Sequence, residues 1–313
     1  MNLNYKKPVI IYNPNAGGGK AKKRFSLYYE FLLKEKLFES IDVIETKNVQ
    51  DVDDKVKEIH SKNQNDLIIS IGGDGTISSI TNSLIKIPKD KRLPLFPLPS
   101  GSGDSLLRDF KIRSIKDAIN NYKSLTAPKE FDLLFVEKIG GDFKYYCINV
   151  IGMGFVSDVV KDIISKGTKK LGAFGYAITI FTAIGNFKPY NTVLKFRDQN
   201  GEMKEFKSEK VYFLTVSNTK YTGGGIMVAP EAKYNDGLMD IIVLYEINRF
   251  QFLRGFLKTF KGKHIKDKGC LYLKTDYLEI YSTPEFELMP DGELFGSSPI
   301  RISIKPKEIS LVV

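Results

Sequence analysis

The stretch Leu67–Thr76 reads LIISIGGDGT and decides the fold of the first part of the chain. It starts as a continuous apolar run, the pattern of a strand that is buried on both faces. The run ends in a glycine-rich turn, and a helical pattern follows with one apolar face at Ile77, Ile80, Leu84 and Ile87. Strand, turn and helix in this order predict one unit of an open parallel α/β sheet.

The same order recurs on both sides of this stretch. Short apolar runs predict three further strands, at Pro8–Asn13, Ile41–Ile44 and Leu93–Leu98. Two more helices have apolar positions at helical spacing, at Phe25, Tyr28, Tyr29, Leu32 and Leu33 in the first and at Val52, Val56 and Ile59 in the second. The repeats predict an open parallel sheet with helices on both faces over residues 1–131.

The pattern changes near Phe131, where short alternating strands begin. They are expected at Asp132–Lys138, Tyr145–Ile151, Thr192–Phe196, Val211–Ser217, Asp240–Tyr245, Tyr277–Tyr281 and Ile300–Ile304. Turn signals separate them, and helical patterns interrupt them at Val156–Phe187 and Arg249–Lys261. This part of the chain predicts an antiparallel β-sandwich as a second domain.

Composition excludes several classes of protein. The chain has 313 residues, a net charge of +10, and only 2 Cys and 2 His. A disulfide framework and a His/Cys zinc site are therefore not expected; Cys147 and Cys270 should pack in the core, and His60 and His264 should be solvated. The polar start of the chain and the glycines in the apolar stretch Leu171–Phe187 predict no secretory signal and no transmembrane helix. We expect a cytoplasmic protein with anionic partners.

Three glycine-rich turns each follow a predicted strand, at Asn13–Lys20, Gly72–Thr76 and Pro99–Asp104. The carboxyl ends of parallel strands form the ligand crevice of such sheets, and glycines there let the backbone approach a phosphate. The first turn is not a P-loop, because Ala21 stands where a Ser or Thr is needed. Asp74 places a carboxylate beside the expected phosphates, which indicates bound Mg²⁺ or a general base for an acceptor hydroxyl.

These turns also carry a family resemblance. The Asn-Pro-x-x-Gly opening, the GGDGT turn and PSGSGDSLLR at Pro99–Arg108 resemble the catalytic domain of diacylglycerol kinases, sphingosine kinases and soluble bacterial lipid kinases. Further similar motifs follow in the family's order at Gly152–Asp158, Gly223–Pro230, Asp236–Asp240 and Asp291–Glu293. GGDGT alone also occurs in NAD kinases, but the ordered set spans nearly the whole chain and is specific.

The resemblance implies an ATP-dependent kinase that acts on a lipid hydroxyl with ATP and Mg²⁺. Its fold would be an α/β nucleotide-binding domain over residues 1–131, a lipid-binding β-sandwich over 132–299, and C-terminal strands over 300–313 that return to the first domain. Asp74 would act on the acceptor hydroxyl or on a Mg²⁺-bound water, and Glu293 would reach the same cleft. The implied nucleotide contacts are Asn13, Gly17, Gly72, Gly73, Gly75, Thr76, Ser102 and Lys169.

The resemblance further implies a structural cation held by the backbone carbonyls around Lys233 and Leu238 and by the carboxylate of Asp236. For the acceptor lipid, Asp104 and Asp158 are the candidate contacts. Asp158 has an equally good alternative as an acid that the dipole favours near a helix N-terminus.

The third turn departs from the diacylglycerol kinase pattern. Many of those enzymes read Gly-Thr-x-Asn-Asp there, whereas this chain has Asp104 at the Asn position and Ser105 at the Asp position. The Gly-Ser-Gly start is closer to the long-chain-base kinases. Diacylglycerol or a related lipid is the expected substrate, and a sphingosine-type or an NAD-kinase-type substrate stays open. Asp74 and Glu293 together argue against a binding module without activity.

The last feature concerns access to lipid. Arg249–Lys263 predicts a helix with Phe250, Leu253, Phe256, Leu257 and Phe260 on one side and basic residues around them. Such a helix could lie in an anionic membrane interface, or its aromatic side could pack on the sandwich. Both could hold if Phe250 and Leu253 are buried. We expect peripheral membrane contact, no nucleic acid partner, and leave a homodimer open.

Overall fold

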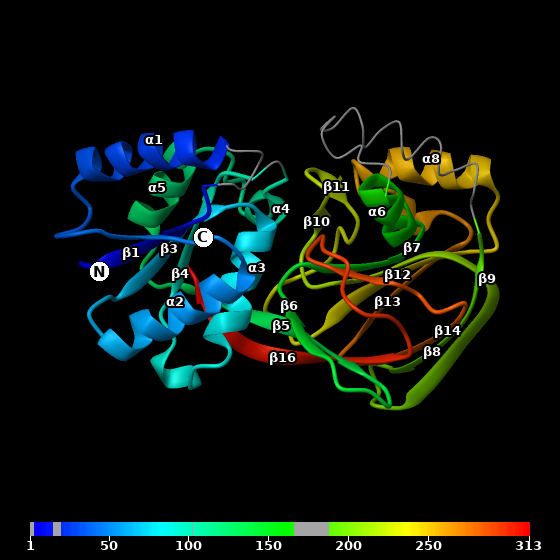
Figure 1. Cartoon of the computed structure of the whole chain (residues 1–313). Coiled ribbons are helices and arrows are strands. Elements are labelled where there is room, and N and C mark those ends of the chain that lie inside the picture. The colour runs from blue at the N-terminus through cyan, green and yellow to red at the C-terminus, as the bar shows by residue number, and fades with distance from the viewer. Residues whose placement is uncertain (1–2, 15–19, 102, 166–187) are drawn as a thin grey trace. The chain divides into compact units, whose positions relative to one another are not determined.

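The computed structural model describes residues 3–14, 20–101, 103–165 and 188–313 (Figure 1). These residues form two compact units. The first takes Met1–Leu133, Gly223–Gly225 and Pro306–Val313, and the second takes Leu134–Thr222 and Ile226–Lys305. In the described ranges, no helix is long and apolar enough to cross a membrane. The stretch Leu171–Phe187 lies outside the described residues.

The first unit contains a parallel sheet in the order β4-β3-β1-β2. Its strands are β1 (Pro8–Tyr12), β2 (Asp42–Glu45), β3 (Leu67–Gly72) and β4 (Leu95–Pro99). All residues of β1, β3 and β4 are buried, as their continuous apolar sequences predict. The last strand of the chain, β16 (Ile300–Leu311), pairs in parallel with β4 at Leu311.

In the described part of the first unit, five helices accompany this sheet. They are α1 (Lys20–Glu35), α2 (Val49–Lys62), α3 (Asp74–Leu84), α4 (Ser105–Arg108) and α5 (Ile115–Ser124), with a 3-10 turn η1 at Lys89–Lys91. Side chains fix two helix starts, because Asn48 and Ser114 each accept a hydrogen bond from the backbone N–H of the third residue of the helix. On α1, Leu32 is buried, as predicted. Leu33 was predicted on the same buried face, but it is 51% exposed.

The second unit is a mostly antiparallel β structure. Its strands run in the order β13-β12-β9-β8-β14-β16, with β7 pairing β9 and β15, and β5 pairing β6. Their bounds are β5 (Lys129–Lys138), β6 (Lys144–Cys147), β7 (Val150–Gly154), β8 (Tyr190–Arg197), β9 (Met203–Ser217), β12 (Met239–Tyr245), β13 (Cys270–Thr275), β14 (Tyr277–Thr283) and β15 (Leu288–Pro290), beside a small hairpin of β10 (Tyr221–Thr222) and β11 (Ile226–Met227). Parallel sheet and antiparallel unit confirm the expected fold class.

Strand β9 organises the core of the second unit. Its first half pairs with β8, and its second half pairs with both β12 and β7. Inward-facing apolar side chains of these strands and of β14 form one cluster that includes Met153, Leu194, Leu214, Ile241 and Ile280. Helices α6 (Phe155–Ser165) and α8 (Arg249–Thr259), with the 3-10 turn η4 (His264–Lys266), complete the unit.

The structure corrects two details of this region. The strand expected at Tyr145–Ile151 is two strands, because the buried carboxylate of Asp291 accepts hydrogen bonds from the N–H groups of Ile148 and Asn149 between β6 and β7. His264 is buried and not solvated. Its Nε2 bonds the carbonyl of Val228, and burial lowers the pKa of the ring.

A further correction concerns α8. The residue that anchors this helix is Phe252, which is buried against Phe155 of α6 with ring centroids 4.7 Å apart. Phe250 is 75% exposed, contrary to the prediction that it could pack on the sandwich. The predicted apolar side of α8 therefore lies partly in solvent, and the side that packs on the second unit is the one that carries Phe252.

Candidate functional site

The second and third glycine-rich turns meet at the carboxyl ends of neighbouring strands. β3 and β4 pair in parallel up to Gly72 and Pro99, so both chains leave the sheet side by side. The first turn follows β1, which pairs with β3 on the side opposite to β4. Of the predicted phosphate contacts, Gly17, Ser102 and Lys169 lie outside the described residues.

Close backbone contact explains why glycines stand in these two turns. A Cβ atom on Gly101 would lie 2.7 Å from the Cα of Gly73, and one on Gly73 would lie 3.2 Å from the Cα of Gly101. A Cβ on Gly72 would collide with the side chain of Thr76 at 2.1 Å. Only glycine allows the two turns to pack backbone against backbone at the ends of β3 and β4.

Asp74 is the first residue of α3, and its carboxylate reaches across to the third turn. One oxygen accepts a hydrogen bond from the N–H of Ser105 at 3.0 Å, and the other accepts from the N–H of Leu106 at 3.3 Å. A Cβ on Gly103 would lie 3.2 Å from the Asp74 carboxylate and 3.4 Å from the N atom of Gly224. The predicted motifs around Asp74, Gly103 and Gly224 thus come together within the first unit.

Asp104 lies beside Asp74 in a left-handed backbone conformation, with φ of 45°. Its carboxylate accepts a hydrogen bond of 2.7 Å from the N–H of Gly101 and so closes the third turn on itself. Burial, aided by the negative charge of Asp74, raises the pKa of Asp104 to about 6. Near pH 6 about half of this group is therefore protonated, whereas an ordinary aspartate is almost fully ionised.

Three side chains that the sequence analysis did not select hold the third turn. Ser100 donates its hydroxyl to the carbonyl of Gly72 at 2.9 Å. From α1, Tyr28 donates to the carbonyl of Pro99, and the guanidinium of Arg24 donates to the carbonyls of Ser100 and Gly101. Arg24 and Tyr28 are four residues apart on one helix face, which was the signal available in the sequence.

The other residues predicted to contact the nucleotide, where the structure describes them, make hydrogen bonds within the first unit. Asn13 donates its side-chain amide to the carbonyl of Lys47 at 3.3 Å and joins the ends of β1 and β2. The N–H of Thr76 donates to the carbonyl of Gly73, and the carbonyl of Gly75 accepts from Ser79. Their assignment as nucleotide contacts stays a prediction.

In the second unit, the candidate acids have distinct surroundings. Glu293 is exposed on the turn that follows β15, and its N–H donates to the carbonyl of Pro290. Asp158 lies in the first turn of α6 and accepts from the hydroxyl of Tyr190 through both oxygens, at 2.9 and 3.0 Å. Its place in the helix agrees with the dipole reading, and its role toward a lipid stays a prediction.

A lysine lies beside the loop of Lys233, Asp236 and Leu238, where the resemblance implies a structural cation. The ammonium of Lys274 lies 3.6 Å from Asp236 and 3.3 Å from the buried Asp240, and it donates to the carbonyl of Glu231 at 2.9 Å. A positive charge thus already lies beside Asp236, the one carboxylate of the implied cation site. Across the described ranges, no cluster of three His, Cys, Asp or Glu side chains that could hold a metal occurs. The cation implied at this loop, held mainly by backbone carbonyls, stays a prediction.

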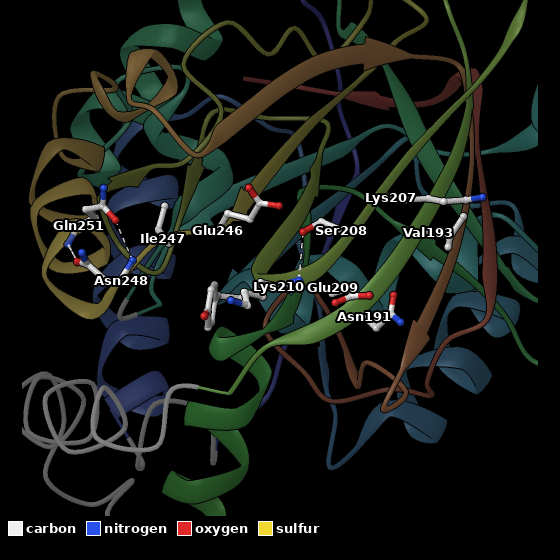
Figure 2. A pocket seen from close by; sticks show the side chains of 11 residues that line it. Asn191, Val193, Lys207, Ser208, Glu209, Lys210, Glu246, Ile247, Asn248 and Gln251 are labelled. Carbon is white, nitrogen blue, oxygen red and sulfur yellow. Dashed lines mark hydrogen bonds between the residues drawn. The ribbon is translucent and has the colours of Figure 1, made fainter.

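A separate hollow of about 840 Å³ opens in the second unit between β8, β9 and the start of α8 (Figure 2). The pairing of β9 is irregular on both sides here, with β8 between Tyr190 and Thr192 and with β12 between Leu244 and Tyr245. Both positive and negative side chains line the hollow, among them Lys207, Glu209, Lys210 and Glu246. No predicted site residue lines it.

Comparisons with known proteins match both parts of the chain to described domain families. Residues 7–136 match the diacylglycerol kinase catalytic domain, and residues 149–313 match the YegS C-terminal NAD kinase beta sandwich-like domain. The chain is 27% identical to the diacylglycerol kinase of Bacillus subtilis (strain 168) over 297 residues, which cover 94% of this chain and 92% of that protein. It is 24% identical over 249 residues, 78% of this chain and 75% of the relative, to a "Probable lipid kinase YegS-like" of Chromohalobacter salexigens.

Solved structures give the same picture. A crystal structure from Bacillus anthracis str. Sterne superposes with a TM-score of 0.76 at 25% identity, covering 100% of this chain and 96% of that one. A diacylglycerol kinase structure from the same organism has a TM-score of 0.68 at 19% identity, covering 99% and 98%, and shows likeness of fold.

Proposed function

Because the chain belongs to the family that joins a diacylglycerol kinase catalytic domain to a YegS-type C-terminal domain, and is thus a lipid kinase, we propose that it phosphorylates the hydroxyl of diacylglycerol with ATP. The names of two kinds of relative support a lipid acceptor, one a diacylglycerol kinase and the other a YegS-like lipid kinase. The proposed acceptor is thus a neutral lipid that carries one free hydroxyl.

The observation that carries this proposal is the position of Asp74 where three glycine-containing segments converge. Its carboxylate lies against the third turn and next to Gly103 and Gly224, where little but backbone surrounds it. A phosphoryl group bound by the N–H groups of the turns would therefore lie close to this carboxylate. Asp74 would then accept the proton of the lipid hydroxyl as the oxygen attacks the γ-phosphate.

Mg²⁺ would accompany ATP at this point. The donor set fits, since Mg²⁺ in kinases takes one or two carboxylates together with substrate phosphates and waters. The Asp74 oxygens each accept one backbone N–H and keep further lone pairs for such a role. When bound, the ion would neutralise charge on the transferred phosphoryl group.

Asp104 bears on the choice of acceptor. Its pKa is raised to about 6, so at pH 7 it is still mostly a carboxylate and differs in charge from the Asn that diacylglycerol kinases carry at this position. Because a relative that matches 94% of this chain is a diacylglycerol kinase, we keep diacylglycerol as the first candidate, and a long-chain base as the second because of Gly101 and Gly103. A soluble NAD-type acceptor is third. We further propose that the enzyme works at the cytoplasmic face of a membrane.

The test is a panel of acceptors in detergent micelles with radiolabelled ATP. Diacylglycerol, sphingosine and NAD are each offered to the wild type and to a variant with Asp74→Asn. We expect phosphatidic acid as the main product and a large loss in the variant. Labelled product from sphingosine alone would overturn the choice of acceptor, and label on NAD alone or no labelled product would overturn the proposed function.

A further inference from the structure

Helix α8 presents an unusual outer surface (orange in Figure 1). Its buried side is formed by Phe252 and Thr259, whereas Phe250 is 75% exposed, Leu257 64% and Phe260, directly after the helix, 52%. Phe250 and Leu257 have the highest exposure of any large apolar side chains in the described part of the chain. Single exposed apolar residues are ordinary, but several on one helix face mark an interaction site.

Charge on this surface has one sign. Residues 249–268 contain seven basic residues and one acid, Asp267. That acid is already paired, because its carboxylate binds the ammonium of Lys258. Arg254, Lys261 and Lys263 form no ion pair within the described ranges, and all three are exposed. We call Phe250, Arg254, Leu257, Phe260, Lys261 and Lys263 the α8 surface.

The helix is held firmly, so the α8 surface is formed in advance. Asn248 and Gln251 make a reciprocal capping box at its start, in which each side chain bonds the other residue's backbone N–H. Phe252 packs on Phe155, and the Lys258–Asp267 pair ties the end of the helix to the chain after η4. Ordering the helix on binding therefore costs little conformational entropy.

We propose that the α8 surface docks onto an anionic lipid bilayer. Exposed aromatic and leucine side chains would enter the interface, while the unpaired cations would lie among the phosphate groups. This inference rests on the proposed function, which requires a membrane lipid as substrate. The unpaired charge of this surface has one sign, which matches a surface of lipid phosphates.

Three variants test the docking without ATP or turnover. The first changes Phe250 and Leu257 to Gln, and the second changes Arg254, Lys261 and Lys263 to Gln. Lys258 stays, since it stabilises the fold through Asp267. A matched control removes the same charges from the first unit, through R113Q, K91Q and K116Q, which are exposed and form no ion pair in the described residues. Sedimentation is measured with vesicles of phosphatidylcholine containing about one third phosphatidylglycerol, and with pure phosphatidylcholine.

We expect the wild type to bind the anionic vesicles and not the neutral ones, and to lose binding as salt rises. Each α8 variant should weaken binding about tenfold or more, while the control stays within about twofold. Equal loss in the control, or binding that no variant changes, would overturn the proposal. So would a concentration-dependent dimer that the α8 variants abolish. Activity on micellar diacylglycerol should persist in both α8 variants; its absence in the wild type would instead count against the proposed function.

Discussion

Asp74 combines a structural contact with the proposed chemical role, and an isosteric change separates them. In Asp74→Asn the amide oxygen can still accept one of the two N–H groups of Ser105 and Leu106, so stability should fall by only about 1 kcal/mol. Turnover should fall about 100-fold or more, because a general base and a metal ligand are lost together. Thermal unfolding and micellar kinase assays measure the two effects.

The matched control for this change is Asp117→Asn. Asp117 also accepts a backbone hydrogen bond, from the N–H of Arg113 at 3.0 Å, but at the start of α5. It should lose similar stability and no turnover. If the Asp74 variant keeps near-normal turnover, the proposed role of this carboxylate is wrong.

Asp104 gives a prediction for the pH dependence of stability. Its pKa is raised by folding to about 6, so the folded protein holds this proton more tightly than the unfolded chain does. As the pH rises from about 4 to about 6, the unfolded chain releases this proton more readily than the folded protein does. The free energy of unfolding therefore falls across this range. Relative to an Asp104→Asn variant, which cannot ionise, the melting temperature of the wild type should fall across this window and then level off. A difference that is the same at pH 4 and pH 7 would contradict the burial of this carboxyl.

At the scale of elements, the packing of the two glycine turns is the feature most sensitive to a single methyl group. In Gly101→Ala the new Cβ would lie 2.7 Å from the backbone of Gly73 and 2.7 Å from the Asp104 carboxylate, so the turns must separate. We expect a loss of about 2 kcal/mol in stability and weaker ATP binding. Gly255→Ala is the control, since its Cβ would meet nothing within 4 Å and α8 should gain stability. Calorimetry of unfolding and of nucleotide binding checks both variants.

The loop that precedes β12 carries the next prediction. If Lys274 supplies its positive charge, a chelator should leave the melting temperature of the wild type unchanged. Lys274→Met should cost about 3 kcal/mol, because it leaves the carboxylate of Asp240 buried beside only the Tyr272 hydroxyl. A melting temperature that drops on chelation in the wild type would instead support the predicted cation at Asp236.

The sequence predicted the elements whose signals are local. The run LIISIGGDGT gives both the buried strand β3 and the turn before α3, because hydrophobic pattern and glycines act within ten residues. Features that depend on residues distant in the sequence could not be predicted. The carboxylate of Asp291 binds the backbone between β6 and β7, where one strand was predicted, and buried His264 bonds the carbonyl of Val228. For the site, a lone acid among glycines identified Asp74, whereas Arg24 and Tyr28 act through carbonyls about 75 residues away, a pairing that only the fold creates.

At the scale of the whole molecule, the expectation that Glu293 works together with Asp74 can be tested by kinetics. Glu293 is exposed and its side chain has no hydrogen bond among the described contacts, so Glu293→Gln should unfold at the wild-type temperature. If the two acids act on one reaction, the single variants should each lose about 100-fold in turnover, and the double variant should be hardly slower than the slower single, because residues that act as a unit are not additive. Glu285→Gln, another exposed acid of the second unit, should leave turnover unchanged. Multiplied losses in the double variant would mean that Glu293 acts independently of Asp74, and full activity of Glu293→Gln would remove it from the site.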